Sequence, residues 1–397
     1  MKSTPSNTAS LSREEILKEV KRIVVKVGSG VLTSKEGLNS AVIEGLASDI
    51  SSLMEKGLQV IVVSSGAIAS GLKKVGISSR PQSISEQQAL AAVGQPSLMM
   101  AYEEAFARYR KKVAQLLITR DDFNHRRRYL NARNTVLTLL SWGILPIFNE
   151  NDTVVVDEIK FGDNDNLSAM VVNLTDAQLL INLTDIDGLF DKDPRSCPDA
   201  RLIQVVERVD SRIRACANCI PGFLGTGGMA SKIQAAQKAA LGGVPTIIAN
   251  GLKRGILTRI FSGAQEGTLF LPRTKALCSR KHWIAFTKAP KGEIIIDQGA
   301  EKAIVERGKS LLPSGIVGVR GRFGVGDAVL ILNREGRRVA VGLAAYPSGD
   351  VEKIMGAKSS EIEKILGYKH DDEVIHRDNL VLMEQIEGEE ETCRLRN

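Results

Sequence analysis

The chain has 397 residues, enough for two or three domains, and its 43% hydrophobic and 25% charged residues are ordinary for a globular protein. It has no apolar run of about 18 residues and no apolar stretch near the N-terminus, so we expect neither a membrane span nor a secretory signal. Five cysteines are too few for a disulfide framework, which favours a cytoplasmic location. The four histidines form no Ser/His/Asp or zinc-like grouping, so chemistry without an imidazole base is expected.

The first two thirds of the chain alternate between β-branched runs and helix-like segments. We expect strands at 23–27, 59–63, 113–119, 145–149, 178–183 and 246–249, and helices at 41–56, 131–142, 167–175 and 231–241. Strands buried on both faces that alternate with helices predict an α/β fold, a three-layer αβα sandwich with a mainly parallel sheet. We expect residues 1–20 to be a loose N-terminal extension that ends in a short amphipathic helix.

The pattern changes near residue 272. Short β segments separated by glycines follow at 292–296, 315–319, 328–332 and 338–343, as in a small β-barrel. We therefore expect a catalytic domain over 21–272, a small β pseudo-barrel over 282–365 and an acidic C-terminal tail over 366–397. The net charge is +7, and basic residues exceed acidic ones between 273 and 369, which leaves RNA a possible partner. Only 4% of the residues are aromatic, so the chain has few side chains on which RNA bases could stack. We therefore do not favour RNA as a partner.

Glycine and polar residues gather where four of the predicted strands end. The turns are 28–30, 64–66, 149–152 and 184–185. In parallel α/β sheets ligands bind beyond the carboxyl ends of the strands. The sequence therefore predicts that these turns converge on one edge of the sheet and form the site there.

Two lysines accompany glycine-rich turns. Lys26 interrupts an apolar strand just before Gly28 and Gly30, where burial of its charge is costly unless an anion meets it. Lys232 closes the turn Gly225-Thr226-Gly227-Gly228-Met229-Ala230-Ser231, and a helix that starts behind a glycine turn can bind phosphate. We expect both lysines to bind phosphate groups; the alternatives are a snorkelling or ion-paired Lys26 and a turn that is merely flexible.

The run Gly162-Asp163-Asn164-Asp165-Asn166 lies between the two lysines in the sequence and precedes a helix that we expect to begin at Leu167. Asp and Asn are preferred helix caps, but four in succession exceed what a cap needs. A carboxylate between two lysines would hold both ammonium groups in place, and we favour Asp165 for this task over the alternative, metal ligation. The polar turn 149–152 could bind an ammonium group of a substrate, or be only a polar loop.

Absent motifs narrow the reaction. The chain has neither a Gly-x-x-x-x-Gly-Lys-Ser/Thr loop nor a protein-kinase catalytic loop. Phosphoryl transfer needs charge neutralisation and alignment more than covalent help. A carboxylate acceptor is already ionised at neutral pH and needs no general base. Two lysines in a histidine-poor site therefore fit phosphorylation of a carboxylate better than that of an alcohol.

These motifs resemble the amino acid kinase family over about 20–270, in order and at the expected spacing. The matching segments are 25–29, 64–69, 90–95, 130–135, 149–152, 162–169, 183–185 and 225–229. The part at about 282–365 is similar to a PUA domain, a pseudo-barrel found in many RNA-modifying enzymes. The chain departs from the family in its N-terminal extension and at Asn182, where an apolar residue is more usual. We expect neither departure to touch a matched site residue.

The resemblance is to those family members that act on L-glutamate. It implies ATP-dependent phosphorylation of the γ-carboxylate to L-glutamyl 5-phosphate, the first step of L-proline biosynthesis, with Mg2+ and with feedback inhibition by L-proline. Lys26 and Lys232 would stabilise the transferring phosphoryl group, and Asp165 would organise both. Glutamate would bind to Ser65, Asp152 and Asn164. ATP would bind to Lys26, Thr184, Asp185, Thr226, Gly227, Gly228, Met229, Ala230, Ser231 and Lys232. The metal ligands remain unassigned.

Two rival functions stay open at this point. One is another kinase of the same family, acting on uridylate, aspartate or N-acetylglutamate. The other is an RNA-binding or RNA-modification protein that acts through the C-terminal module, whose affinity for RNA would be sensitive to salt. We also expect the chain to form a homo-oligomer, either a dimer or a tetramer.

Overall fold

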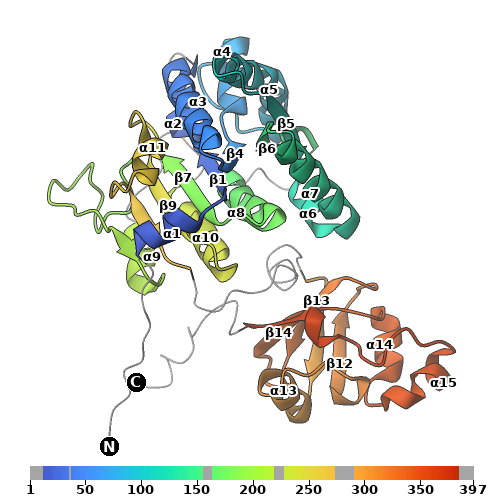
Figure 1. The fold of residues 1–397 in the computed structure, drawn as a ribbon. Coiled ribbons are helices and arrows are strands. Elements are labelled where there is room, and N and C mark those ends of the chain that lie inside the picture. Colours follow the sequence, from blue (N-terminus) through green and yellow to red (C-terminus); the bar gives the residue numbers. More distant parts are fainter. Residues whose placement is uncertain (1–11, 35–36, 155–162, 219–227, 273–289, 384–397) are drawn as a thin grey trace, which may run out of the picture. The chain divides into compact units, whose positions relative to one another are not determined.

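The structure is a computed structural model that describes residues 12–34, 37–154, 163–218, 228–272 and 290–383. These residues divide into two compact units, which succeed one another along the chain near residue 273 (Figure 1). None of the described helices is long and apolar enough to cross a membrane.

The first unit is built on an eight-stranded sheet. Its strands, in their order across the sheet, are β5 (Val113–Ile118), β6 (Leu145–Glu150), β4 (Gln59–Ser64), β1 (Arg22–Val27), β7 (Leu179–Thr184), β9 (Thr246–Asn250), β10 (Thr268–Phe270) and β8 (Val205–Val206). Only the pairing of β10 with β9 is antiparallel among these neighbours. The predicted mainly parallel sheet is confirmed.

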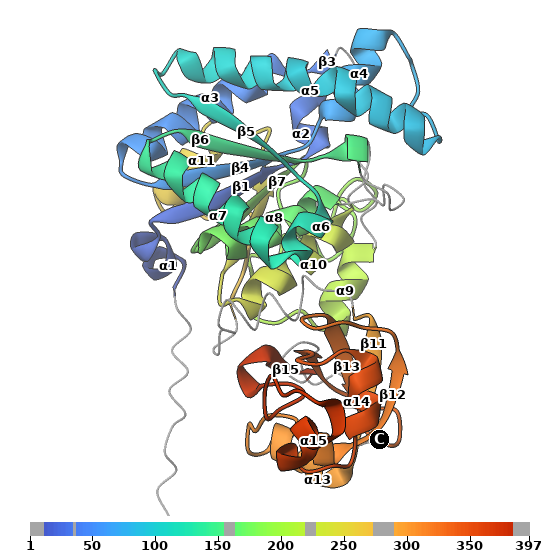
Figure 2. The same ribbon diagram turned by 90° about the vertical axis from the view of Figure 1, so that its right-hand side faces the viewer.

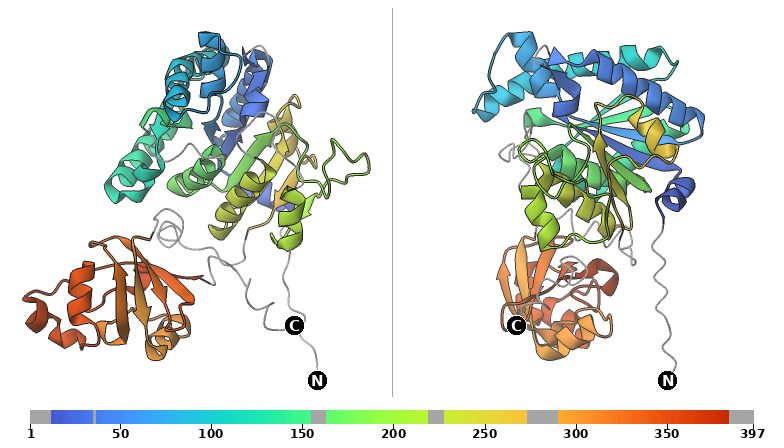
Figure 3. Two further views of the ribbon diagram at one scale, coloured as in Figure 1. Left: turned by 180° about the vertical axis from the view of Figure 1, so that it is seen from behind. Right: turned by 90° about the vertical axis from the view of Figure 1, so that its left-hand side faces the viewer.

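Helices cover both faces of this sheet. Figure 2 shows α3 and α5 on one face and α7, α8 and α10 on the other, and Figure 3 gives two further views of these layers. The helices of the unit are α1 (Arg13–Glu19), α2 (Ser29–Leu32), α3 (Ser40–Glu55), α4 (Ala67–Val75), α5 (Ile84–Ala107), α6 (Arg120–Asn124), α7 (Arg126–Ser141), α8 (Asp163–Thr175), α9 (Ser211–Asn218), α10 (Met229–Leu241) and α11 (Ile256–Phe261). The αβα sandwich predicted from the sequence is confirmed.

Side chains of the central strands alternate between the two helix layers, as the period of a β-strand requires. On β1, Ile23 and Val25 belong to the cluster that includes α3 and α5, whereas Val24 packs with residues of α7 and α8. Lys26 has the parity of Val24, so its side chain enters the layer that contains α8. The alternation of the first strand thus decides which helix Lys26 meets.

Two helices that the sequence reasoning did not predict, α4 and α5, pack at glycine contacts. A Cβ on Gly71 would lie 2.0 Å from the carbonyl oxygen of Leu90, and one on Gly94 would lie 1.9 Å from that of Ala67. Glycine at both positions therefore lets the two backbones touch. This contact holds the start of α4, and with it the turn after β4, against the long helix.

The predicted helix starts need correction. The sequence predicts starts at Leu167 and Ser231, but α8 begins at Asp163 and α10 at Met229. The side chains of Asn164, Asp165 and Asn166 bond to other elements rather than serving as local caps; Asn166, for example, accepts a hydrogen bond of 2.7 Å from Lys238. The polar run is therefore part of the helix.

The N-terminal segment ends as predicted, in a short helix. Helix α1 carries a capping box formed by Ser12 and Glu15, and its Leu17 and the following Val20 are buried in the main core. The end of the predicted extension is thus packed against the first unit.

The second unit has a five-stranded sheet whose neighbouring strands are antiparallel except for β11 with β13. The strands, in their order across the sheet, are β12 (Ile316–Gly321), β11 (Gly292–Ile296), β13 (Ala328–Leu332), β14 (Arg338–Leu343) and β15 (Leu380–Leu382). Three short helices that we did not predict, α13 (Gln298–Val305), α14 (Ser348–Ile354) and α15 (Ile362–Leu366), accompany it.

The predicted end of this unit at residue 365 is too early. Val374, Ile375 and Val381 are fully buried, and the first two belong to its core. β15 pairs with β14 through Val341 and Val381. Apolar residues inside a segment of acidic composition therefore complete the sheet, and the compact unit includes part of the segment that we predicted to be an acidic tail.

Candidate functional site

The turns that follow β1, β4 and β7 meet at one edge of the sheet, as predicted. Val27 on β1 pairs with Ser64 on one side and with Leu183 on the other. The backbone N–H of Gly28 donates to Leu183, and that of Ser65 donates to Val27, each over 3.1 Å. The residues after these three strands are therefore within reach of one another.

Lys26 and Asp165 form a buried ion pair at this edge. The Nζ of Lys26 lies 2.6 Å from the Oδ1 of Asp165. Lys26 is 4% exposed and Asp165 is fully buried, so neither charge is solvated by bulk water. Such a pair persists only because each charge satisfies the other and further donors complete the set.

Lys232 approaches the same carboxylate from α10. Its Nζ lies 3.5 Å from the Oδ2 of Asp165 and donates to the carbonyl oxygen of Gly228 over 3.4 Å. The structure therefore brings the two lysines, distant in sequence, to opposite oxygens of one buried carboxylate. This is the arrangement that the sequence predicts; the catalytic roles of the three residues stay a prediction.

Two uncharged donors complete the surroundings of the carboxylate. Ser231 donates from its Oγ to Oδ2 over 2.5 Å, and Asn182 donates from its Nδ2 to Oδ1 over 3.1 Å. Each oxygen of Asp165 thus receives one lysine and one neutral donor. The expectation that Asn182 touches no site residue is wrong. Asn182 pairs with Lys26 in the strand register and faces the same helix, so it reaches the same carboxylate.

The charges of this triad perturb one another strongly. Burial raises the pKa of the Asp165 carboxyl, but the attraction of Lys26 and Lys232 outweighs burial, so the pKa lies well below its ordinary value. Burial lowers the pKa of the Lys26 ammonium, and the attraction of Asp165 offsets only part of that shift. Asp165 is therefore ionised at neutral pH, while Lys26 holds its proton less tightly than a solvated lysine.

Uncharged amides form the other part of the site. The Nδ2 of Asn164 lies within hydrogen-bonding distance of the Oγ of Ser65 (3.2 Å) and the Oδ1 of Asn149 (3.1 Å). Asn149 in turn donates to Gln95 over 2.8 Å. The Oδ1 of Asn164 is buried and has no hydrogen-bond partner among the residues that the structure describes, which leaves one unsatisfied acceptor there. The structure thus joins Ser65 and Asn164, two of the three residues expected to bind glutamate.

The third of these residues, Asp152, lies just beyond the end of β6 in a short 3-10 helix (Asp152–Val154), and its side chain is half-buried. Its carboxylate acts electrostatically on the guanidinium of Arg80, a residue between α4 and α5. Asp152 follows Asn149 by three residues in the sequence. Its side chain is a carboxylate, whereas the side chains of the amide network are neutral.

The residues expected to bind ATP are only partly described. Thr184 ends β7 and donates to the carboxylate of Asp185 over 3.1 Å. Gly228 directly precedes α10, and Met229, Ala230, Ser231 and Lys232 form its first turn, whereas Thr226 and Gly227 lie outside the described residues, as do Gly162 and Gly225. The described part of the turn places a helix N-terminus next to Asp165.

No group of three or more His, Cys, Asp or Glu side chains within the described ranges is arranged to hold a metal ion. Both oxygens of Asp165 already accept from donors, so binding of a metal there would have to displace an ammonium group or a neutral donor. Of the two readings of Asp165, the geometry favours the one in which it holds the lysines.

Three roles in the site were absent from the sequence prediction: Asn182 as a donor to Asp165, and Asn149, predicted only as part of the polar turn 149–152, and Gln95 as supports of Asn164. Alternation along β7 could have placed Asn182 on the face of Lys26, because Leu180, two residues earlier, lies in the layer of α8. Gln95 gives no such signal, since it is brought in by the packing of α5.

A mainly parallel α/β sheet with two buried ammonium groups on one carboxylate at its strand ends indicates a phosphotransferase. The model of the amino acid kinase family matches residues 21–250, and that of the PUA domain matches residues 292–366. The chain belongs to the amino acid kinase family.

Curated relatives match it over almost its whole length. Proteins called glutamate 5-kinase are 51% identical in Syntrophotalea carbinolica, 53% in Geobacter sulfurreducens and 55% in Geobacter metallireducens. The matches cover 93% of this chain in the first case and 94% in the other two, and 99% or 100% of the relatives. These relatives therefore share both the kinase domain and the C-terminal unit with this chain.

Proposed function

We propose that this chain is an enzyme that transfers the γ-phosphoryl group of ATP to the γ-carboxylate of L-glutamate, giving L-glutamyl 5-phosphate, the first step of L-proline biosynthesis. The observation that carries the proposal is the buried Asp165 carboxylate between the ammonium groups of Lys26 and Lys232. The relatives that share half of its residues and carry this activity in their name identify the acceptor. The rival family substrates and the RNA alternative are not favoured.

The triad supplies the electrostatic part of the reaction. An oxygen of the glutamate γ-carboxylate attacks the γ-phosphorus, and the bond to the bridging oxygen of ADP breaks as the new P–O bond forms. No proton has to move, because the acceptor is already ionised. The ammonium groups of Lys26 and Lys232 neutralise the charge on the phosphoryl oxygens, and Asp165 holds both in place before the substrates arrive.

ATP binding is assigned to the strand end at Thr184 and Asp185, to Lys26, and to the start of α10. The N-terminus of α10 would direct backbone N–H groups and the positive end of the helix dipole toward phosphate oxygens. Mg2+ would enter with the nucleotide, since this ion is usually held by phosphates together with one or two carboxylates. It would add charge neutralisation to that supplied by the lysines.

Glutamate is assigned to the amide side of the site. The substrate brings an α-ammonium group, and the carboxylate of Asp152 and the unpaired Oδ1 of Asn164 are acceptors suited to it. Ser65 can offer a hydroxyl to either carboxylate of the substrate. A zwitterion held by its α-ammonium group would leave the γ-carboxylate directed toward the triad.

Three further properties belong to the proposal by family membership. We expect a homo-oligomer, feedback inhibition by L-proline and a cytoplasmic location. None of these alters the chemistry of the triad.

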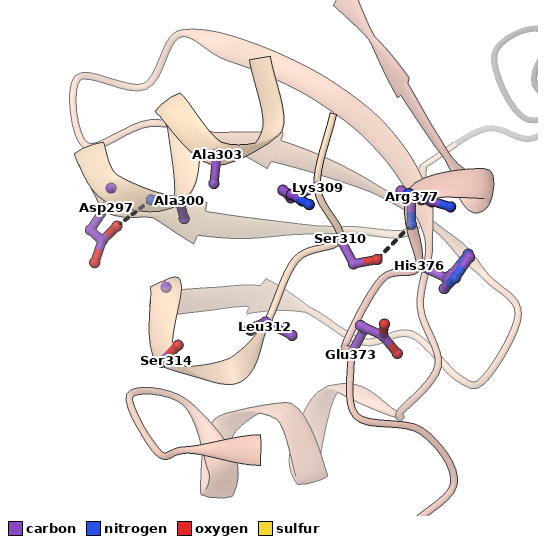
Figure 4. A pocket seen from close by; sticks show the side chains of 12 residues that line it. Asp297, Ala300, Ala303, Lys309, Ser310, Leu312, Ser314, Glu373, His376 and Arg377 are labelled. Atoms are coloured by element: carbon purple, nitrogen blue, oxygen red, sulfur yellow. Dashed lines mark hydrogen bonds between the residues drawn. The ribbon is translucent and has the colours of Figure 1, made fainter. Parts of the chain in front are cut away.

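The second unit gives no reason to prefer RNA as the substrate. It contains a hollow of about 640 Å3 beside α13, in which Arg377 donates its backbone N–H to Ser310 over 3.0 Å (Figure 4). The lining mixes the cations Lys309 and Arg377 with the anions Asp297 and Glu373. A phosphate backbone is bound by an excess of positive charge, so this mixed lining does not point to nucleic acid.

The test is ADP release by the purified chain with MgATP and each of four acceptors: L-glutamate, L-aspartate, N-acetyl-L-glutamate and UMP. We expect turnover with L-glutamate and, because a shorter side chain or a blocked α-ammonium group removes a contact, less than one tenth of that rate with the others. A higher kcat/KM for UMP or N-acetyl-L-glutamate than for L-glutamate would overturn the proposal.

A further inference from the structure

We infer that Asn182 is a positioning residue for phosphoryl transfer, which acts by fixing the plane of the Asp165 carboxylate between the two lysines; this inference rests on the proposed function. Asn182 lies in the middle of the sheet, on β7, between β1 and β9. It is fully buried. Its only side-chain hydrogen bond within the described residues runs from Nδ2 to the Oδ1 of Asp165, over 3.1 Å.

The two oxygens of Asp165 have matched surroundings. Oδ1 receives Lys26 and the amide of Asn182, and Oδ2 receives Lys232 and the hydroxyl of Ser231. An ion pair fixes the distance between two charges but not the rotation of the carboxylate about its Cβ–Cγ bond. One neutral donor on each oxygen fixes that rotation, and with it the directions in which the two ammonium groups point.

Asn182 is retained at a cost in stability. Its Oδ1 is buried and finds no hydrogen-bond partner in the described part of the chain, although buried amide oxygens are nearly always satisfied. An apolar side chain of the same branched shape would remove that unsatisfied oxygen and suit a strand whose neighbours Ile181 and Leu183 are apolar and fully buried. The asparagine is thus unfavourable for folding and favourable for orienting Asp165, the combination expected of a residue that serves the site.

Thr246 offers a matched comparison in the same sheet. It is also fully buried, its Oγ1 also lacks a hydrogen-bond partner within the described ranges, and it lies on β9, the neighbour of β7. Its register partner on β7 is Leu180, not Asn182. Replacement of Thr246 by valine therefore removes a buried unsatisfied polar atom and leaves the hydrogen bonds of Asp165 unchanged.

The experiment measures kcat, both KM values and Tm for the full chain and for Asn182→Leu, Asn182→Ala and Thr246→Val, with MgATP and L-glutamate. We expect kcat to fall about tenfold in both Asn182 variants, with KM values within about twofold of those of the unchanged chain. Tm should stay level or rise in Asn182→Leu and fall in Asn182→Ala, which leaves a cavity. Thr246→Val should keep kcat and match the Tm behaviour of Asn182→Leu.

A structural role alone would change Tm and leave kcat as it was. Folded Asn182 variants with kcat within twofold of the unchanged chain, or with a raised KM and normal kcat, would overturn the inference and leave the proposed function standing. Absence of ADP release from the unchanged chain with L-glutamate would overturn both. If Asn182→Leu does not fold, the same criteria apply to Asn182→Ala.

Discussion

The two sides of the site solve different electrostatic problems. On one side, around β1, β7 and α10, full charges are buried and paired: Lys26 and Lys232 with Asp165. On the other, around β4 and β6, the hydrogen-bonded side chains are the neutral amides Asn149, Asn164 and Gln95, and the carboxylate of Glu150 at the end of β6 is buried as well. Paired opposite charges thus lie where a phosphoryl group would move, while amides and carboxylates lie where an amino acid would be recognised.

The difference matters because buried charges contribute little to stability. Taking two charges out of water costs several kcal/mol per ion, and their attraction only about offsets this cost. Ion pairs of this kind therefore add little to the stability of the fold, but they hold charged groups in fixed positions for catalysis. Amide networks carry a smaller penalty and can change partners when a substrate arrives.

The largest effect should follow from removal of the charge that holds the two lysines together. We expect Asp165→Asn to lower kcat by about 1000-fold or more, since both ammonium groups lose their anchor. Two uncompensated buried charges should also lower the free energy of unfolding by about 3–5 kcal/mol. Steady-state kinetics and urea unfolding measure the two effects.

Asp199 provides a control for that comparison, because it forms an exposed pair with Lys192. We expect Asp199→Asn to change stability by less than about 1 kcal/mol and to leave kcat unchanged. Equal effects of the two substitutions would contradict the distinction between the buried triad and ordinary surface pairs.

The next largest loss of activity should follow from removal of the charge of Lys232 alone. Lys232→Met keeps the apolar stem and removes the charge, so we expect a folded protein whose kcat/KM is lower by about 100-fold to 1000-fold. Lys192→Met, at an exposed position, serves as the control. Near-normal kcat in Lys232→Met would remove this residue from the mechanism.

A smaller effect should appear on raising the pH. The pKa of Lys26 is lowered in the folded chain, and its protonated form is the one that can neutralise phosphate charge. Activity should therefore be full below that pKa and fall as the pH rises through it, at a pH below the value of about 10.4 for an unperturbed lysine. The profile of kcat/KM against pH reports the free enzyme and measures this value.

Arginine at the same position gives the control, because a guanidinium keeps its proton beyond about pH 12. The residual activity of Lys26→Arg should lack the alkaline decline. A decline at the same pH in both proteins would assign it to another group.

The smallest effect should come from the amino-acid side. We expect Asp152→Ala to raise the KM for L-glutamate about tenfold, since one charged contact to the α-ammonium group is lost. The KM for ATP should stay within about twofold. A change in the KM for ATP alone would move Asp152 to the other side of the site.

Six of the eight strands of the sheet could be predicted from the sequence because buried β-branched runs alternate with helical segments, whereas the short strands β8 and β10 were not predicted. A lysine within the apolar β1, and polar turns at several strand ends, are visible without coordinates. Helix α5 was missed because Pro96 lies inside it, and proline argues against a helix interior. The start of α8 was misplaced because its Asn and Asp side chains look like local caps yet bond to distant elements.

Asn182 shows a second limit of prediction from the sequence. Its neighbours are apolar, so composition alone describes an uninterrupted buried strand. Only the side of β7 on which it lies, together with the position of α8, shows that it donates to Asp165. Tertiary placement, not residue type, gives such a residue its role.

The most direct test of the account is a crystal structure of the chain with L-glutamate and a non-hydrolysable ATP analogue. We expect the Nζ atoms of Lys26 and Lys232 to lie within about 3.2 Å of oxygens of the γ-phosphate while both still flank Asp165. The glutamate γ-carboxylate should face the γ-phosphorus from the side of Asn164. A complex in which either ammonium group points away from the phosphate would contradict the account.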